Sequence, residues 1–188
     1  MFEALLGRRS CRHFLARPVE QEKIMKILEC AIFAPSPANK QPWEFVVTSN
    51  PKYNHELKAA VEVTKGKLAE RSGWKWLPSF SVDFLLEAPV LIVVNGDPER
   101  NGAEQFLDEP GKGYEHGCCA AIENMLIAAH GLGLATLWFS MFEKRDVRKI
   151  FGVDKKLDPV AIICLGYTDV SITAPARKDF ATKVKFLE

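Results

Sequence analysis

Apolar residues recur with the period of an α-helix in two long stretches of the chain. Residues 19–33 carry one apolar face opposite a charged one, and Pro35 and Pro37 then end the helix because proline lacks a backbone donor. Residues 115–132 are mostly small and apolar on every side, which predicts a helix buried nearly all round. Both stretches are therefore expected to pack directly on the core.

Short apolar runs between these helices predict the strands of a central sheet, because they are rich in β-branched residues. Strands are expected at residues 45–48, 90–94, 135–139 and 160–166, and further helices at 53–71 and 144–151, the last ended by Gly152. Stretches without a clear period are expected to be irregular, namely 73–83, 95–113 and the tail 167–188. Helices alternating with strands predict an α+β or α/β sandwich, with helices covering a central sheet.

Length and charge narrow the class of protein. The 188 residues contain no linker or repeat, so a single domain over 1–188 is expected. Twenty-five basic against 24 acidic residues leave a net charge of +1, which argues against a nucleic-acid or anionic-membrane surface. No leader segment or membrane-spanning run is apparent, and the five cysteines have no CxxC spacing. A cytoplasmic protein with reduced thiols is expected.

Several familiar catalytic motifs are missing from the sequence. No GxGxxG follows a strand and no phosphate-binding GxxxxGK[ST] occurs, so a Rossmann dinucleotide site is disfavoured; Gly131 and Gly133 fit a helix end better. The four histidines have no metal-ligand spacing, and there is no GxSxG nucleophile motif. No catalytic side chain and no metal site are therefore predicted.

Two polar blocks in the first 45 residues are candidates for binding an anion and a flat ring. Arg8-Arg9-Ser10-Cys11-Arg12 concentrates guanidinium groups that suit phosphate and carbonyl edges, and in an extended segment Arg8, Ser10 and Arg12 share one face. The alternative is a solvated basic patch. The second block, Ala34 to Gln41, has more donors and acceptors than a turn needs, although a plain helix stop also explains part of it. Trp43 after it fits the core better than a ligand contact.

These blocks, with two later ones, resemble the FMN-dependent nitroreductase family. Arg8-Arg9-Ser10-x-Arg12-x-Phe14 is similar to the family's opening RRSxRxF, and Ala34-Pro35-Ser36 through Gln41-Pro42-Trp43 to its APSxxNxQPW. Residues 133–142 resemble GLGTCWxGxF, and Gly166-Tyr167 with Arg177-Lys178 resemble its closing GYP and RK. The four blocks are in the family's order and cover most of the chain.

The resemblance implies an FMN-binding α+β sandwich with a central, mostly antiparallel sheet, assembled as an intertwined homodimer with FMN at the interface. Arg8, Ser10 and Arg177 are implied to contact the phosphate and ribitol, and Arg12 the pyrimidine side of the ring. The block at 35–39 is implied to come from the other subunit. The complete implied cofactor-binding set is Arg8, Arg9, Ser10, Arg12, Pro35, Ser36, Pro37, Asn39, Trp138, Phe139, Ser140 and Arg177.

The family further implies that NAD(P)H reduces the flavin and that a nitroaromatic or quinone then occupies the same face. Arg12 near the pyrimidine edge would stabilise the negative charge of the reduced ring. Ala135 and Ser140 stand where the family usually has glycine, and a side chain at position 140 would restrict access to the substrate pocket. Thr168-Asp169 replace the family's usual proline after Gly166-Tyr167. Dehalogenation, enone reduction or flavin destruction on the same scaffold stay open, as does a flavin carrier or redox sensor.

Overall fold

A four-stranded antiparallel sheet in the order β1-β2-β4-β3 forms the centre of the protein, in a computed structural model that describes residues 2–187. The strands are β1 (Trp43–Thr48), β2 (Val90–Gly96), β3 (Ala135–Phe139) and β4 (Asp158–Gly166). Every residue of β2 is buried and β4 is buried along most of its length, as their uninterrupted apolar runs predict. The predicted strand at 135–139 is confirmed to the residue.

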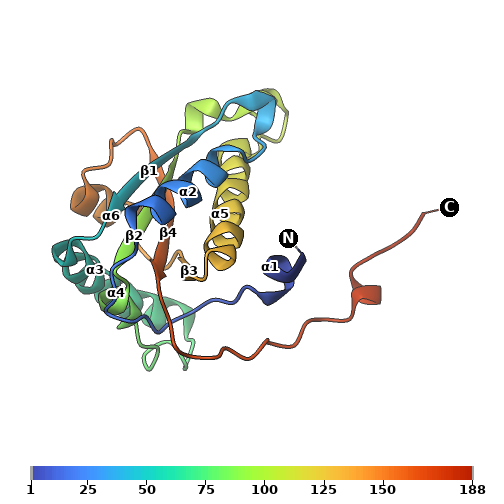
Figure 1. Cartoon of the computed structure of the whole chain (residues 1–188). Helices are drawn as coiled ribbons and strands as arrows, with labels where there is room; N and C mark the ends of the chain where they lie inside the picture. The colour runs from blue at the N-terminus through green and yellow to red at the C-terminus, as the bar shows by residue number, and fades with distance from the viewer. Residues whose placement is uncertain (1, 188) are drawn as a thin grey trace.

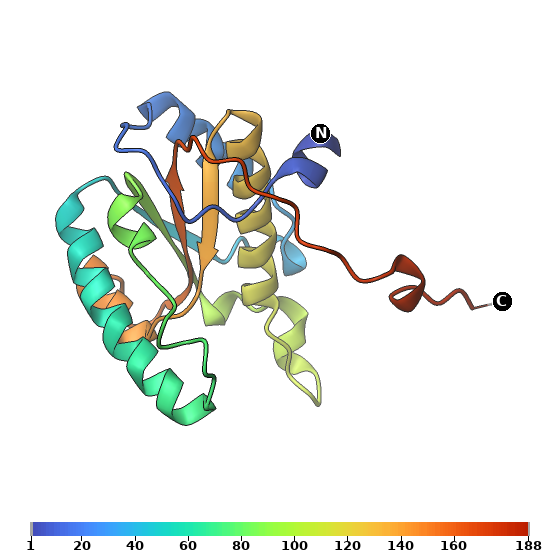
Figure 2. The ribbon, with the colours of Figure 1, turned by 90° about the horizontal axis from the view of Figure 1, so that it is seen from below.

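Helices cover both faces of the sheet (Figures 1 and 2). On one face lie α2 (Gln21–Ile32) and α5 (Gly113–Gly131), which share a hydrophobic cluster with β2 and β4. On the other face lie α3 (Pro51–Ser72), α4 (Phe84–Glu87) and α6 (Lys144–Phe151), over a second cluster. The predicted sandwich of helices on a mostly antiparallel sheet is therefore confirmed.

Local sequence signals mark where several of these helices begin and end. The Asn50 side chain accepts the Lys52 N–H at 3.0 Å and begins α3. Gly152 ends α6 in the left-handed region at φ +66°, which confirms the predicted stop. Gly133 has φ +73° and its N–H bonds to the His130 carbonyl at 3.0 Å, so this glycine turns the chain from α5 into β3.

Several short elements have no apolar period by which the sequence could predict them. A short helix, α1 (Phe2–Gly7), has no buried residue, so it has no amphipathic pattern to detect. Residues 95–113 contain the 3₁₀ turns η2 (Pro98–Arg100) and η3 (Gly102–Phe106). The tail after β4 runs away from the body of the molecule and forms only η4 (Phe180–Thr182) (Figures 1 and 2). Over residues 2–187, no helix is long and apolar enough to cross a bilayer.

A cluster of charges ties the start of β4 to α5 and α6. Asp158 accepts from Tyr114 at 3.0 Å, from Lys144 at 2.8 Å and from Arg148 at 2.5 Å. Burial of Asp158 works to raise its pKa, but the bonds from Lys144 and Tyr114 and the charges of Lys144 and Arg148 outweigh it, so the pKa lies below its ordinary value. The carboxylate therefore stabilises the fold in its charged form.

Asp158→Asn is expected to lower the free energy of unfolding by about 1.5–3 kcal/mol near neutral pH, because two cations lose their charge-assisted bonds. Since the folded pKa is depressed, this stabilisation is complete above the ordinary carboxyl pKa of 3.8 and is lost as pH falls through the folded value. Urea unfolding at fixed protein concentration should show the difference shrinking as the pH falls below 3.8. Asp146→Asn, whose partner Arg145 is 70% exposed, is the matched control and should change little.

Candidate functional site

The segment that follows α1 is held in an extended form against the edge of the sheet. Ser10 pairs with Thr136 of β3 as a parallel bridge, and the Cys11 N–H donates to the Thr136 carbonyl at 2.8 Å. The Cys11 side chain is fully buried, whereas Ser10 and Arg12 on either side of it are exposed. Because this segment runs extended along β3, its side chains alternate, so that Ser10 and Arg12 point to the outside and Cys11 points to the core.

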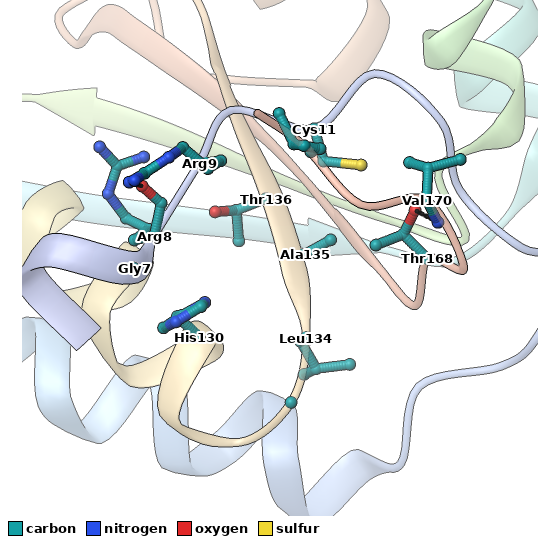
Figure 3. A pocket seen from close by; sticks show the side chains of 12 residues that line it. Gly7, Arg8, Arg9, Cys11, His130, Leu134, Ala135, Thr136, Thr168 and Val170 are labelled. Atoms are coloured by element: carbon teal, nitrogen blue, oxygen red, sulfur yellow. Dashed lines mark hydrogen bonds between the residues drawn. The ribbon is translucent and has the colours of Figure 1, made fainter. Parts of the chain in front are cut away.

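A hollow of about 280 Å³ lies between this segment, the end of α5 and the start of the tail (Figure 3). Its polar groups come from Arg8, Arg9, His130, Thr136 and Thr168. Cys11, Leu134, Ala135, Val170, Ile172 and two glycines supply the apolar remainder of the lining. Cationic and hydroxyl donors beside an apolar wall are suited to a ligand with an anionic end and an uncharged body.

The two arginines in this hollow have different partners. The Arg9 guanidinium donates to the carbonyls of Leu6 and Arg8, each at 2.7 Å, so it closes the end of α1. Among residues 2–187 the Arg8 side chain is held only by Glu123 of α5, with 3.8 Å between Nε and Oε1, and the Glu123 side chain is 46% exposed. Exposed ion pairs of this kind are worth little. Arg8 is therefore the cation that an incoming anion can capture, while Arg9 mainly holds the backbone.

Arg12 does not lie in the same hollow as Arg8, although the sequence places them on one face. Its guanidinium is 5.9 Å from the centre of the Phe80 ring and lines a second hollow with Trp76 and Phe84. The reason is local: the Arg8 N–H still bonds to the Ala4 carbonyl at 3.0 Å, so strand-like alternation begins only after Arg8. Arg177 lies in the exposed tail and lines neither hollow.

The turn after α2 has an unusual backbone. Ala38, Asn39 and Gln41 have φ values of +50°, +52° and +46°, in the left-handed region that residues other than glycine rarely adopt. Ser36 Oγ accepts the Gln41 N–H at 2.9 Å, and the Gln41 side chain donates to Asn39 at 3.3 Å. Strain of this kind is concentrated at ligand sites, where the surroundings hold it in place. The strained backbone is consistent with a ligand contact at this turn, beside its role in ending α2.

Within one chain the turn and the arginine hollow are at opposite ends of α5. An added Cβ at Gly117 would meet Pro42 and Ser36, whereas one at Gly7 would meet His130. Gly117 and His130 are thirteen positions apart in the helix, which corresponds to about 20 Å. Within one chain the first and second polar blocks are therefore about 20 Å apart along α5.

The third block lies in β3 and just after it. Phe139 is buried and Trp138 half-buried, whereas Ser140 is exposed immediately beyond the strand. Phe139 contacts Phe84 with 5.6 Å between ring centres, which joins the end of β3 to the second hollow. Trp43 belongs to the core, as the sequence favours.

Burial makes two of the five cysteines poor nucleophiles. All five are free thiols, as predicted. Burial raises the pKa of Cys118 and of Cys164 to about 12, so neither forms a thiolate near neutral pH. Across the described part of the chain, no group of three or more His, Cys, Asp or Glu side chains is placed to hold a metal ion.

Four polar residues at the arginine hollow escape sequence reasoning. Strand pairing and helix packing bring three of them close to Arg8, namely Thr136, Thr168 and Glu123. No local sequence pattern predicts these contacts. His130 gives a weak signal, because it is a polar residue that ends an otherwise apolar helix just before Gly131. Thr136, Thr168 and His130 complete the polar lining of the hollow, and Glu123 pairs with Arg8.

The fold is an α+β sandwich with a hollow lined by two arginines at the edge of its sheet. The chain belongs to the nitroreductase family, whose family model matches residues 5–167. It is 30% identical over 172 residues, 89% of this chain and 76% of the other, to a Methanothermobacter thermautotrophicus protein named as a candidate NADH dehydrogenase/NAD(P)H nitroreductase. It is also 30% identical over 189 residues to the iodotyrosine deiodinase of Haliscomenobacter hydrossis, covering 93% of this chain and 82% of that one.

A solved structure shares the fold over its whole length. The chain superposes on an iodotyrosine deiodinase bound to FMN and 3-iodo-L-tyrosine with a TM-score of 0.81, covering 98% of this chain and 99% of that one. The two sequences are 21% identical, so this likeness establishes the fold alone. The predicted nitroreductase-like sandwich is confirmed by both comparisons.

Proposed function

We propose that this protein is an FMN-dependent oxidoreductase that takes hydride from NAD(P)H and reduces a flat acceptor, such as a nitroaromatic or a quinone, in a ping-pong cycle. The carrying observation is the hollow in which the weakly held Arg8 faces Thr136 and His130, in a chain of the nitroreductase family. We also take residues 1–188 to act as one cytoplasmic FMN-binding unit.

The residues present are suited to FMN. When bound, the flavin supplies the hydride chemistry, and the protein holds and orients it. Arg8, with Ser10 beside it, would receive the phosphate and ribitol, and Arg12, further along the same extended segment, would receive the pyrimidine edge. Binding sites for molecules of this size measure about 300–1,000 Å³. The hollow of about 280 Å³ in one chain therefore fits part of FMN, and the ring extends beyond it.

A second chain completes the proposed site. Because about 20 Å of α5 separates the strained turn from Arg8, the partner subunit's Pro35, Ser36, Pro37 and Asn39 are the ones that would reach this flavin. Backbone amides near Trp138, Phe139 and Ser140 would lie beside the reactive face. Arg177 would join the phosphate only if the tail packs on the partner.

Reductive dehalogenation is the second candidate reaction. It is favoured by the 30% identity to the deiodinase of Haliscomenobacter hydrossis over 93% of this chain. The third candidate, a flavin carrier or redox sensor, predicts a bound flavin without steady turnover. All three share the FMN site and differ only in the fate of the electrons once the flavin is reduced.

The purified protein is expected to be yellow and to release FMN on heating. A colourless protein that takes up no FMN, or one that releases stoichiometric FAD, contradicts the proposal. The FMN-loaded protein should consume NADH or NADPH steadily once a quinone or nitroaromatic is present, with parallel double-reciprocal plots. Iodide release from 3-iodo-L-tyrosine without quinone reduction supports dehalogenation, and reduction of the flavin without turnover supports the carrier.

A further inference from the structure

The tail after β4 has a single polar anchor on the body of its own subunit. His13 Nε2 lies 3.6 Å from Asp169 Oδ1, and within residues 2–187 no other hydrogen bond or ion pair joins residues 168–187 to the rest of the chain. We propose, on the basis of the proposed function, that His13 is a positioning residue for the cofactor, whose charged ring holds the start of the tail against the arginine hollow.

The anchored stretch of the tail has one side towards the arginine hollow. Thr168, Val170 and Ile172 line that hollow (Figure 3), whereas Asp169 between them contacts the His13 ring. Alternate side chains of an extended segment point in opposite directions. An anchor on Asp169 therefore fixes the opposite side of the tail, which supplies the Thr168 hydroxyl and part of the apolar wall.

The other ring nitrogen of His13 is fixed by α4. Glu87 Oε2 lies 3.0 Å from His13 Nδ1 and also accepts the Phe14 N–H at 3.0 Å. In the described part of the chain, Glu87 and Asp169 are the only carboxylates within 4.0 Å of the ring nitrogens. An ionised carboxylate only accepts hydrogen bonds, and a neutral imidazole has one N–H to donate. A neutral ring therefore serves one carboxylate, and only the imidazolium attracts both.

The contact with Asp169 is the one that depends on the charge of the ring. Its 3.6 Å between Nε2 and Oδ1 is too long for a hydrogen bond, so the attraction is that of an ion pair. Histidine is the side chain that changes its charge between about pH 5 and 8. The anchor is therefore complete below this range and is lost as the pH rises through it. FMN should bind more tightly while the tail is held.

The two partners of this anchor are particular to this chain. His13 occupies a variable position of the motif Arg8-Arg9-Ser10-x-Arg12-x-Phe14, and Asp169 belongs to the pair that replaces the usual proline. The side chains of His13 and Asp169 are 51% and 65% exposed. Exposed ion pairs change an equilibrium constant by up to about fivefold, which sets the size of the expected effect.

The test compares FMN affinity in the wild type, Asp169→Asn, His13→Gln and the double variant, at about pH 5.5 and about pH 8.5. At the lower pH, Asp169→Asn should weaken FMN binding by about twofold to fivefold relative to its effect in the His13→Gln background. At the higher pH this coupling should fall below about 1.5-fold. Comparing the two backgrounds cancels the titration of the FMN phosphate and any direct repulsion between Asp169 and that phosphate.

A histidine elsewhere provides the matched control. His55 is exposed on α3 and lines neither of the two hollows. Asp169→Asn should therefore have the same effect in the His55→Gln background as in the wild type, at both pH values. A coupling that His55→Gln also removes would overturn the assignment to His13.

Urea unfolding of the same four proteins gives a second measurement that needs no FMN. The coupling should be about twofold to fivefold in the unfolding equilibrium constant at about pH 5.5 and vanish at about pH 8.5. No coupling at the lower pH, or an equal one at both, overturns the anchor. Coupling in unfolding with none in FMN affinity overturns the positioning role. A protein that takes up no FMN but shows the coupling in unfolding contradicts the proposed function and supports the anchor.

Discussion

Replacing Arg8 by alanine is expected to lower the affinity for FMN by about tenfold to a hundredfold. The physical reason is the loss of a charge-assisted bond to the phosphate, worth about 1.5–3 kcal/mol, where 1.4 kcal/mol corresponds to a factor of about ten. The loss should not be offset by Arg9, whose guanidinium already donates to the carbonyls of Leu6 and Arg8. Equilibrium dialysis or flavin fluorescence of apoprotein titrated with FMN measures the effect.

Two further variants separate a phosphate contact from a general charge effect. Arg145→Ala removes a cation that is 70% exposed on α6, far along the chain from the hollow, and should leave FMN affinity unchanged. Glu123→Gln frees Arg8 from its 3.8 Å partner and should maintain or tighten FMN binding, but only while Arg8 is present. Unchanged affinity in Arg8→Ala at physiological salt would assign Arg8 to a solvated basic patch.

The sequence predicts the layered core well because burial imposes a period on it. The helix over 115–132 and the strand over 160–166 are bounded within a few residues of α5 and β4, since their apolar runs are long and end at glycine or polar turns. The strand β3 begins and ends at the expected residues. Elements without a buried face have no apolar period, which is why the sequence does not predict α1.

The candidate site is only partly predictable, because strand pairing and helix ends decide which side chains line the same hollow. Arg8 and Arg12 belong to one motif but line different hollows, since the end of α1 turns Arg8 towards Glu123. Thr136 and Thr168 join Arg8 through contacts distant in sequence. The left-handed backbone at Ala38 could not be read from an alanine, whose side chain normally disfavours it.

The ends of the chain carry a surface that a single chain does not bury. Phe180, Phe186 and Leu187 of the tail are 72%, 84% and 83% exposed. Phe2 and Leu6 of α1 are 72% and 75% exposed. Exposed apolar side chains gathered on two extended ends are typical of an interaction surface. In the homodimer that we propose, these residues pack on the partner subunit.

Removing residues 173–188 is therefore expected to convert the dimer into a monomer and to abolish tight FMN binding, by about a hundredfold or more in affinity. The truncation leaves Thr168, Val170 and Ile172 of the arginine hollow in place but removes Arg177, so Arg177→Ala in the full chain is measured beside it to separate the loss of that cation from the loss of the dimer. The truncation acts by separating Arg8 from the partner subunit's Pro35 and Asn39. Light scattering and FMN titration of the same samples measure both effects.

A double substitution in the full-length chain keeps this test independent of any folding defect. Phe180→Asp with Phe186→Asp places charge in the proposed interface and should also give a monomer, with far-ultraviolet circular dichroism unchanged because neither side chain is buried. Val63→Asp, at a site 58% exposed on α3, is the matched control and should stay dimeric. A truncated protein that is monomeric yet binds FMN as tightly as the full chain would show that one subunit holds the whole cofactor. The opposite result is the expected one, because the proposed flavin site takes the turn and the arginine hollow, about 20 Å apart in one chain, from two different subunits.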